Sequence, residues 1–118
     1  VDVVRIRSDL RRDIMVNSYR GEVALTLDGQ PHVLRLTLGA LVELEQELES
    51  DSLVALIERF ERGDFKMRDL IALLTAGLRG GGWTGSEADL LKCKIQGGPV
   101  EAAQVAGRLL KYTFSLPE

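Results

Sequence analysis

The chain is poor in the residues that form covalent cross-links, metal sites and aromatic clusters. Of its 118 residues only Cys93 is a cysteine and only His32 is a histidine, and aromatic residues make up 5%. One cysteine cannot form a disulfide within the chain, which fits a reducing compartment. One histidine and one cysteine also fall short of the three or four ligands that a zinc site needs. The sequence therefore predicts an aliphatic core, with no metal and no cofactor.

Long apolar runs and an excess of positive charge are also missing. No apolar run approaches the roughly 20 residues that a membrane-spanning helix needs. The formal net charge is −3, so no overall basic field attracts nucleic acid or acidic lipid. The N-terminus lacks the apolar centre of a signal peptide. Hydrophobic residues make up 45%, which is typical of a globular protein. Together with the net charge and the missing apolar segments, this predicts a cytoplasmic protein that binds neither membranes nor nucleic acid.

The first 20 residues differ in composition from the rest of the chain. They hold five arginines against three aspartates, and their apolar residues are scattered. We interpret residues 1–20 as a basic N-terminal arm that is disordered, or that lies partly outside a natural start at Met15. A short helix over residues 8–15, capped by Ser8, is the alternative. We expect residues 21–118 to form a single domain.

Residues 22–38 are the one segment with the pattern of a β-hairpin. Apolar and polar residues alternate in both of its arms, which is typical of strands with one buried face. Such a hairpin needs a cover of helices, because an isolated one is marginal in water. The leucines and the valine predicted to share the buried face are Val23, Leu25, Leu27, Leu34, Leu36 and Leu38.

The register of this hairpin depends on the length of its turn. A two-residue turn at 28–29 has the favoured Asp-Gly sequence and pairs Leu25 with His32. A four-residue loop that ends at Pro31 pairs Leu25 with Leu34 instead. We favour the longer loop, because it aligns apolar residues across the strands and keeps proline out of the ladder.

Helical periodicity follows the hairpin to the end of the chain. The predicted fold class is α+β, with one N-terminal β-hairpin packed by four to five α-helices, and the architecture is mostly helical. We expect helices over about 38–49, 52–62, 66–79, 84–95 and 99–114. Their predicted N-terminal signals are Thr37, Ser50 or Asp51, Asp64, Thr84 or Ser86, and Pro99. Gly63 and the Gly80–Gly82 run are predicted stops.

Signals for catalysis are weak. Cys93 lies between Lys92 and Lys94, which would lower the pKa of its thiol, but no motif supports a nucleophile there. The glycine run 80–82 lacks the spacing of a phosphate-binding loop, and we interpret it as a flexible connection between helices. Acidic residues fall on helix faces that we expect to be solvated: Glu43, Glu47, Glu58 and Glu61. We therefore predict no enzyme and no catalytic residue.

Three residues are candidate partner contacts: Trp83, Leu110 and Phe114. A lone tryptophan beside the glycine run either closes the edge of the core or anchors a partner, because tryptophan is enriched at binding hot spots. Leu110 and Phe114 belong to a regular stripe on the last predicted helix. This stripe is either ordinary core or a partner surface, and its members are Val100, Ala103, Gly107, Leu110 and Phe114.

Several ordered blocks of the chain resemble a small family encoded in gene transfer agent and related prophage tail clusters. The blocks span residues 20–30, 34–41, 51–54, 59–60, 76–83 and 97–103. The resemblance covers about residues 20–118 and leaves out residues 1–14. The family has carried two labels, phage tail tube protein and tail assembly chaperone, and it offers no catalytic residues to assign here.

The resemblance implies a role in tail morphogenesis. A tail assembly chaperone of this kind is expected to be small and largely helical, and to bind the long, helical and apolar tape measure protein through apolar grooves. Tail tube subunits are β-rich, so one hairpin among helices favours the chaperone label. A structural tail subunit is the alternative, and a nucleic-acid-binding regulator that uses the arginine-rich arm is a weaker one. Apolar helices and a hairpin edge favour self-association as well.

Overall fold

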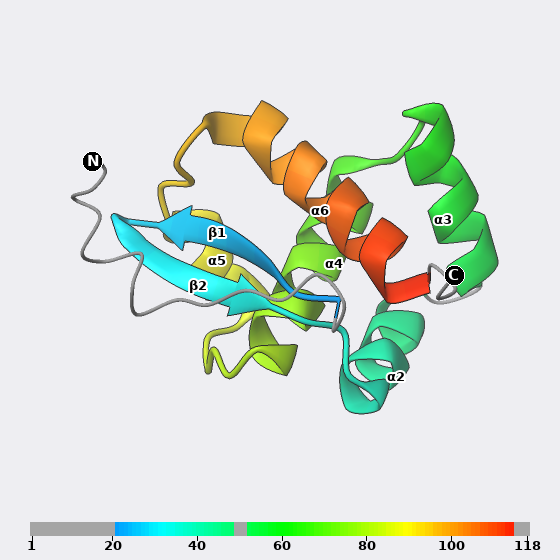
Figure 1. Cartoon of the computed structure of the whole chain (residues 1–118), viewed down its shortest axis with the longest axis horizontal. Coiled ribbons are helices and arrows are strands. Elements are labelled where there is room, and N and C mark those ends of the chain that lie inside the picture. The colour runs from blue at the N-terminus through cyan, green and yellow to red at the C-terminus, as the bar shows by residue number, and fades with distance from the viewer. Residues whose placement is uncertain (1–20, 49–51, 115–118) are drawn as a thin grey trace.

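The computed structural model describes residues 21–48 and 52–114, and the predicted basic arm over residues 1–20 lies outside this part. Two antiparallel strands are followed by five helices, which confirms the α+β class with a mostly helical remainder. Figure 1 shows the hairpin on one side, α6 crossing in front of α4, and α3 at the opposite end. The elements are β1 (Val23–Leu27), β2 (Gln30–Leu34), α2 (Leu38–Glu47), α3 (Leu53–Arg62), α4 (Met67–Gly80), α5 (Glu87–Lys92) and α6 (Gly98–Phe114).

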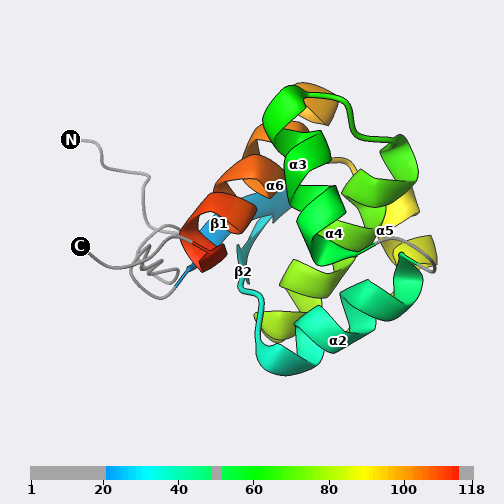
Figure 2. The same cartoon turned by 90° about the vertical axis from the view of Figure 1, so that its right-hand side faces the viewer.

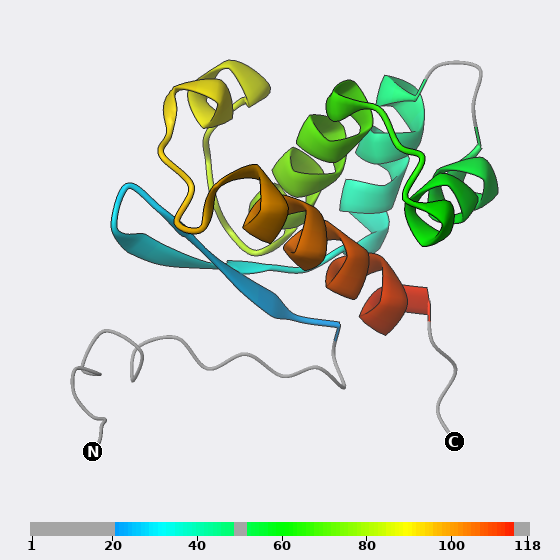
Figure 3. The same ribbon diagram turned by 90° about the horizontal axis from the view of Figure 1, so that it is seen from above.

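The central helix of the fold is α4. It packs against β2, α2, α5 and α6, and Leu73, Leu74 and Leu78 on it are fully buried. Seen from above in Figure 3, the hairpin lies on one side of the helices, and α6 and α4 lie over it. A two-stranded sheet cannot bury its apolar face alone, so this helical cover is what stabilises the hairpin.

The predicted four-residue loop of the hairpin is wrong, and the two-residue turn forms instead. Asp28 and Gly29 have φ angles of 51° and 80°, which the type I′ turn of a tight hairpin requires. Leu25 therefore pairs with His32, and Pro31 pairs with Thr26. This second pair from the turn is a non-hydrogen-bonded pair. The missing N–H of Pro31 thus removes no bond between the two strands, and the reason for placing proline outside the ladder disappears.

The buried face of β1 agrees with the prediction, whereas that of the second arm ends early. Val23, Leu25 and Leu27 are 2–4% exposed. Leu34 and Leu36 are buried as expected, but Leu38 is 83% exposed. It lies in the first turn of α2 because the Thr37 hydroxyl accepts a hydrogen bond from Ala40 N at 3.0 Å and begins the helix there.

The outer edge of β1 is covered by the segment that follows α5. Asp28 N donates to Lys94 O at 2.8 Å, and Gln96 N donates to Thr26 O at 3.0 Å. Lys94 N donates in turn to Asp28 Oδ1 at 2.8 Å. This segment takes the place of a short third strand, which explains why α5 ends at Lys92 and not near residue 95 as predicted.

The edge of β2 is closed by the glycines at the end of α4. Arg35 N donates to Gly77 O at 2.9 Å. A Cβ on Gly80 would overlap the carbonyl oxygen of Arg35, and a Cβ on Gly81 would overlap that of Val33. The glycine run does end the helix as predicted, but two of its members also let the backbone of the second arm lie directly on α4. It is therefore a packing contact, and not only a flexible connection.

The helix caps agree with the prediction in part. The N-cap of α3 is Ser52, whose hydroxyl accepts from Ala55 N at 3.1 Å, and not Ser50 or Asp51. Gly63 ends α3 with a φ of 71°, as expected. Of the two competing signals before α5, Ser86 is the N-cap, and its partner is Asp89. The predicted cap of α4, Asp64, is wrong, because Asp69 Oδ2 accepts from Lys66 N at 3.0 Å and starts the helix later.

The face of α6 that enters the core shares only Leu110 with the predicted stripe. The buried side chains are Ala102, Val105, Ala106, Leu109 and Leu110, whereas Val100 is 69% exposed and Phe114 is 40% exposed. Small side chains on this face let α6 approach α4, where a Cβ on Gly77 would meet the Leu109 side chain at 2.6 Å. Compared with an α6 that buries the whole predicted stripe, the helix is rotated about its axis. Most of the predicted stripe therefore lies at the edge of the core.

Candidate functional site

The displaced stripe of α6 forms one wall of an apolar groove. The groove encloses about 430 Å³ between α3 and α6. We call it the α3–α6 groove. Leu110 lies deepest, at 4% exposure, and Phe114 lies at the open end. Its lining is Ile57, Phe60, Glu61, Gly107, Leu110, Lys111 and Phe114.

The second wall, α3, is held in place by few contacts. Leu56 is fully buried and anchors the helix. Arg59 Nε donates to Asp69 Oδ2 at 3.1 Å, which ties α3 to the first turn of α4. The Phe60 and Phe65 rings stack with their centroids 4.3 Å apart. A helix attached mainly along one side leaves its other apolar side chains, such as Ile57, open to the groove.

The floor of the groove is kept open by a glycine. A Cβ built on Gly107 would meet no atom within 4 Å. Glycine in the middle of a helix lowers stability by about 0.5–1 kcal/mol relative to alanine. No packing contact of the described residues requires glycine here. The open space above Gly107 is therefore the clearest feature that a partner could use.

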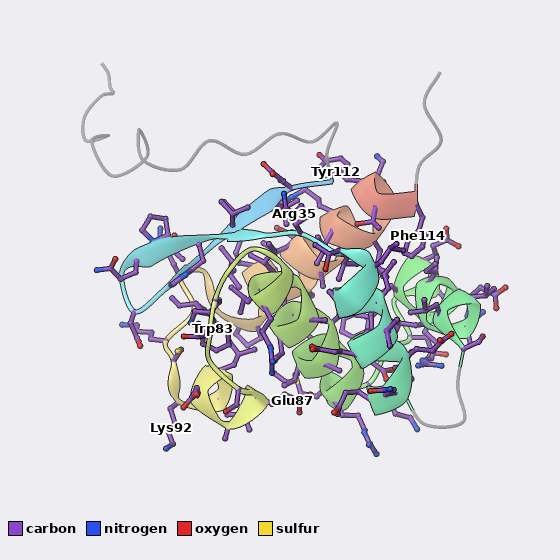
Figure 4. All side chains as sticks on the ribbon, turned by 90° about the horizontal axis from the view of Figure 1, so that it is seen from below. Arg35, Trp83, Glu87, Lys92, Tyr112 and Phe114 are labelled. Carbon is purple, nitrogen blue, oxygen red and sulfur yellow. The ribbon has the colours of Figure 1, made fainter. Side chains whose placement is uncertain are left out.

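Trp83 lies elsewhere, in the connection between α4 and α5. Figure 4 shows it at the α5 end of the molecule, far from Phe114. Its backbone N–H donates to Leu78 O at 2.9 Å, and a Cβ on Gly85 would overlap its ring. The side chain is half-buried and packs against the core. The structure thus brings Leu110 and Phe114 together and leaves Trp83 at a separate, polar hollow.

Sequence reasoning missed the contribution of α3 to this site. Ile57 and Phe60 on α3 are half-buried and line the groove. The available signal was on α6, where two apolar stripes compete: one contains Ala102, Val105 and Leu109, and the other contains Gly107. Only one of the two stripes packs fully into the core, and most of the other lies at its edge.

Three titratable side chains of the described residues have shifted pKa values: Cys93, Glu87 and Asp89. The pKa of the Cys93 thiol is raised by burial and by the nearby Asp28 carboxylate, opposite to the lowering expected from its lysine neighbours. Burial and the adjacent Glu47 carboxylate raise the pKa of Glu87. The Ser86 hydrogen bonds lower the pKa of Asp89, as a helix cap does. These shifts follow from local packing.

Residues 21–48 and 52–114 also show no sign of a metal site or of a membrane-spanning helix. Within these ranges, no group of three or more His, Cys, Asp or Glu side chains is placed to hold a metal ion. None of the helices described is long and apolar enough to cross a membrane. Figure 2 shows α3 in the upper part of this view and α2 at the bottom.

The comparisons with known proteins agree with the resemblance of the sequence blocks. A family model described as phage tail tube protein, GTA-gp10, matches residues 20–116. No curated protein and no solved structure matches the chain significantly. The matched family is structural and not enzymatic. Because the match spans nearly the whole chain, this protein belongs to the phage tail tube protein, GTA-gp10, family of gene transfer agent and phage tails.

Proposed function

We propose that this protein is a gene transfer agent tail assembly chaperone, which binds the tape measure protein during tail morphogenesis in the bacterial cytoplasm. The α3–α6 groove is the observation that carries the proposal. Its Leu110 and Phe114 wall is apolar, its floor is open above Gly107, and one flank is a lightly attached helix. An amphipathic helix of a tape measure protein fits such a groove, because helix-in-groove binding uses a row of apolar anchors.

The sheet supports this assignment over a tube wall. A tube wall needs strand edges that can pair with neighbouring subunits. Here Lys94 and Gln96 cover the edge of β1 near its turn. On the other side, Pro31 has no N–H to donate, and Arg35 N is already bonded to Gly77 O. A two-stranded sheet with both edges engaged in this way is poor material for a continuous β-ring.

The direct test is co-expression with the tape measure protein of the same gene cluster. We expect the soluble fraction of the tape measure protein to increase several-fold and the two proteins to co-purify. A tape measure protein that stays insoluble and does not co-purify would overturn the proposal.

A substitution in the groove locates the contact. Gly107→Met places a long side chain in the open space, and we expect it to reduce co-purification by about tenfold. Ala88→Met adds the same side chain on the exposed surface of α5 and is the matched control, which should bind like the wild type. Circular dichroism checks that both variants fold.

A structural subunit that remains in the particle is the second candidate, and the family description itself favours it. Quantitative mass spectrometry of purified particles separates the two functions. Stoichiometric copies of this chain per tail would support the structural subunit, whereas its absence from finished particles would support a chaperone that is released.

A further inference from the structure

Several exposed apolar side chains lie outside the α3–α6 groove. In the described part of the chain, seven large hydrophobic residues are at least 40% exposed, and only Phe114 belongs to that groove. Met67 is 59% exposed and lines a second groove. Leu38 and Val42 are 83% and 56% exposed on α2. The proposed binding of a tape measure protein leaves these two sets unexplained.

The second groove is strongly apolar. It encloses about 600 Å³ between the first half of α4 and the segment that joins α5 to α6. We call it the Met67 groove. Lys94 is the only charged residue among the described residues that line it. The others are Met67, Leu70, Ile71, Leu74, Cys93, Ile95, Gln96, Gly97, Gly98, Pro99 and Ala102.

The exposed face of α2 has the complementary chemistry. Leu38, Val42 and Glu45 follow at spacings of four and three residues, so they share one helix face, and all three are exposed. The helix carries three glutamates and no basic residue. It therefore presents two aliphatic side chains beside a negative charge, and we call this surface the α2 patch.

We propose that the α2 patch of one copy of this protein docks into the Met67 groove of a second copy. Leu38 and Val42 enter the apolar hollow, and Glu45 meets Lys94 at its rim. Opposite charges at a rim orient a contact and speed its formation, while the buried aliphatic groups supply the affinity. The contact is small, so we expect a dissociation constant on the order of 10–100 μM.

The two surfaces lie at different ends of α4 and cannot meet within one copy. The α2 patch is near the last turn of α4, where Arg79 pairs with Glu43 at 3.8 Å. The Met67 groove lies along the first half of that helix. The contact is therefore head-to-tail, and repeating it builds a closed ring or an open filament.

The first test is the concentration dependence of the sedimentation coefficient in analytical ultracentrifugation. We expect Val42→Glu and Met67→Glu each to weaken self-association by more than about tenfold, because each places a charge in the apolar contact. Val54→Glu is the matched control on α3, where the residue is 64% exposed and outside both surfaces. A wild-type protein that remains monomeric at about 1 mM would overturn the proposal.

A mixing experiment distinguishes head-to-tail contact from other modes. Val42→Glu keeps an intact groove and Met67→Glu keeps an intact α2 patch, so an equimolar mixture should form one-to-one dimers that stop growing. If two α2 patches paired with each other, Met67→Glu would associate like the wild type and the proposal would fail. Both variants leave the α3–α6 groove unchanged, so binding of the tape measure protein should persist in them.

The native cysteine in the Met67 groove provides a covalent readout. Val42→Cys places a second thiol on the α2 patch, and a short bis-maleimide should then link it to Cys93 of the next copy. Adding Cys93→Ser should abolish the ladder of linked products. A ladder that persists without Cys93, or no ladder in the Val42→Cys single variant at concentrations where the wild type associates, would contradict the assigned surfaces.

Discussion

Arg59 Nε and Asp69 Oδ2 lie 3.1 Å apart and tie α3 to the start of α4. Their side chains are 16% and 8% exposed. The same carboxylate oxygen also accepts from Lys66 N at 3.0 Å, so one atom begins α4 and fixes the wall of the α3–α6 groove. This carboxylate therefore contributes both to the start of α4 and to the position of the wall.

Substitution of this carboxylate should separate its two roles. Asp69→Asn keeps an oxygen that can accept from Lys66 N but removes the charge that pairs with Arg59. We expect a loss of about 2 kcal/mol in the free energy of unfolding, and a further loss of about 1 kcal/mol for Asp69→Ala, which also lacks the cap. Urea denaturation measures both. Equal stability of the two variants would show that the cap contributes nothing.

The glycines that lie against the second arm of the hairpin should resist any side chain. Gly80→Ala and Gly81→Ala each place a methyl group on a backbone carbonyl oxygen, of Arg35 or of Val33, and a backbone cannot move aside easily. We expect each to lower the free energy of unfolding by more than about 2 kcal/mol. Thermal unfolding followed by circular dichroism tests this, and unchanged melting temperatures would contradict the close packing of the two elements.

Gly107 should behave in the opposite way. Alanine at this position of α6 meets no neighbour within 4 Å and improves helix propensity. We expect Gly107→Ala to raise the free energy of unfolding by about 0.5–1 kcal/mol. Gly107→Ala and Gly80→Ala, measured under the same conditions, should change the free energy of unfolding in opposite directions. A loss of stability would mean that the floor of the groove is already filled.

The carboxylates of Glu47 and Glu87 should produce a pH-dependent effect. Burial and then Glu47 raise the pKa of Glu87 above its ordinary value of 4.5. The folded state therefore holds this proton more tightly than the unfolded state, and its contribution to stability declines as the pH rises through the raised pKa. Glu47→Gln removes the neighbouring charge, and it also removes a negative charge from the last turn of α2, where the helix dipole disfavours one.

We accordingly expect Glu47→Gln to increase the melting temperature at pH 7. The gain should shrink as the pH falls through the raised pKa of Glu87, because a protonated Glu87 carries no charge that Glu47 could repel. Melting temperatures of the two proteins, measured side by side from pH 3.5 to pH 8, test this. A gain of the same size at both ends of the range would argue against the charge as its cause.

The sequence was sufficient where one local signal decided the structure. Alternation in β1 identified its buried face, and Ser86 with Asp89 began α5 as one of the two predicted signals. Sequence reasoning failed where contacts with backbone groups far away in the sequence determine the local structure. The turn at Asp28 is fixed partly by Lys94, and the glycines at 80–81 respond to the carbonyl groups of the second arm.

The candidate site was predicted only in part, for a similar reason. Leu110 and Phe114 were identified from the periodicity of α6, but periodicity alone does not say which of two apolar stripes faces the core. That choice depends on the small residues Ala102 and Ala106, which let α6 pack closely in the core. Whether the named residues contact a partner stays a prediction.

The pairing of the segment after α5 with β1 has a consequence for folding during synthesis. The bond between Lys94 N and Asp28 Oδ1 joins residues 66 positions apart. Contacts over such separations form slowly, because a long loop has to close first. The edge of β1 near its turn therefore stays uncovered while the ribosome makes α2 to α5. We expect this interval to be the time at which the nascent chain is most open to pairing with other strands.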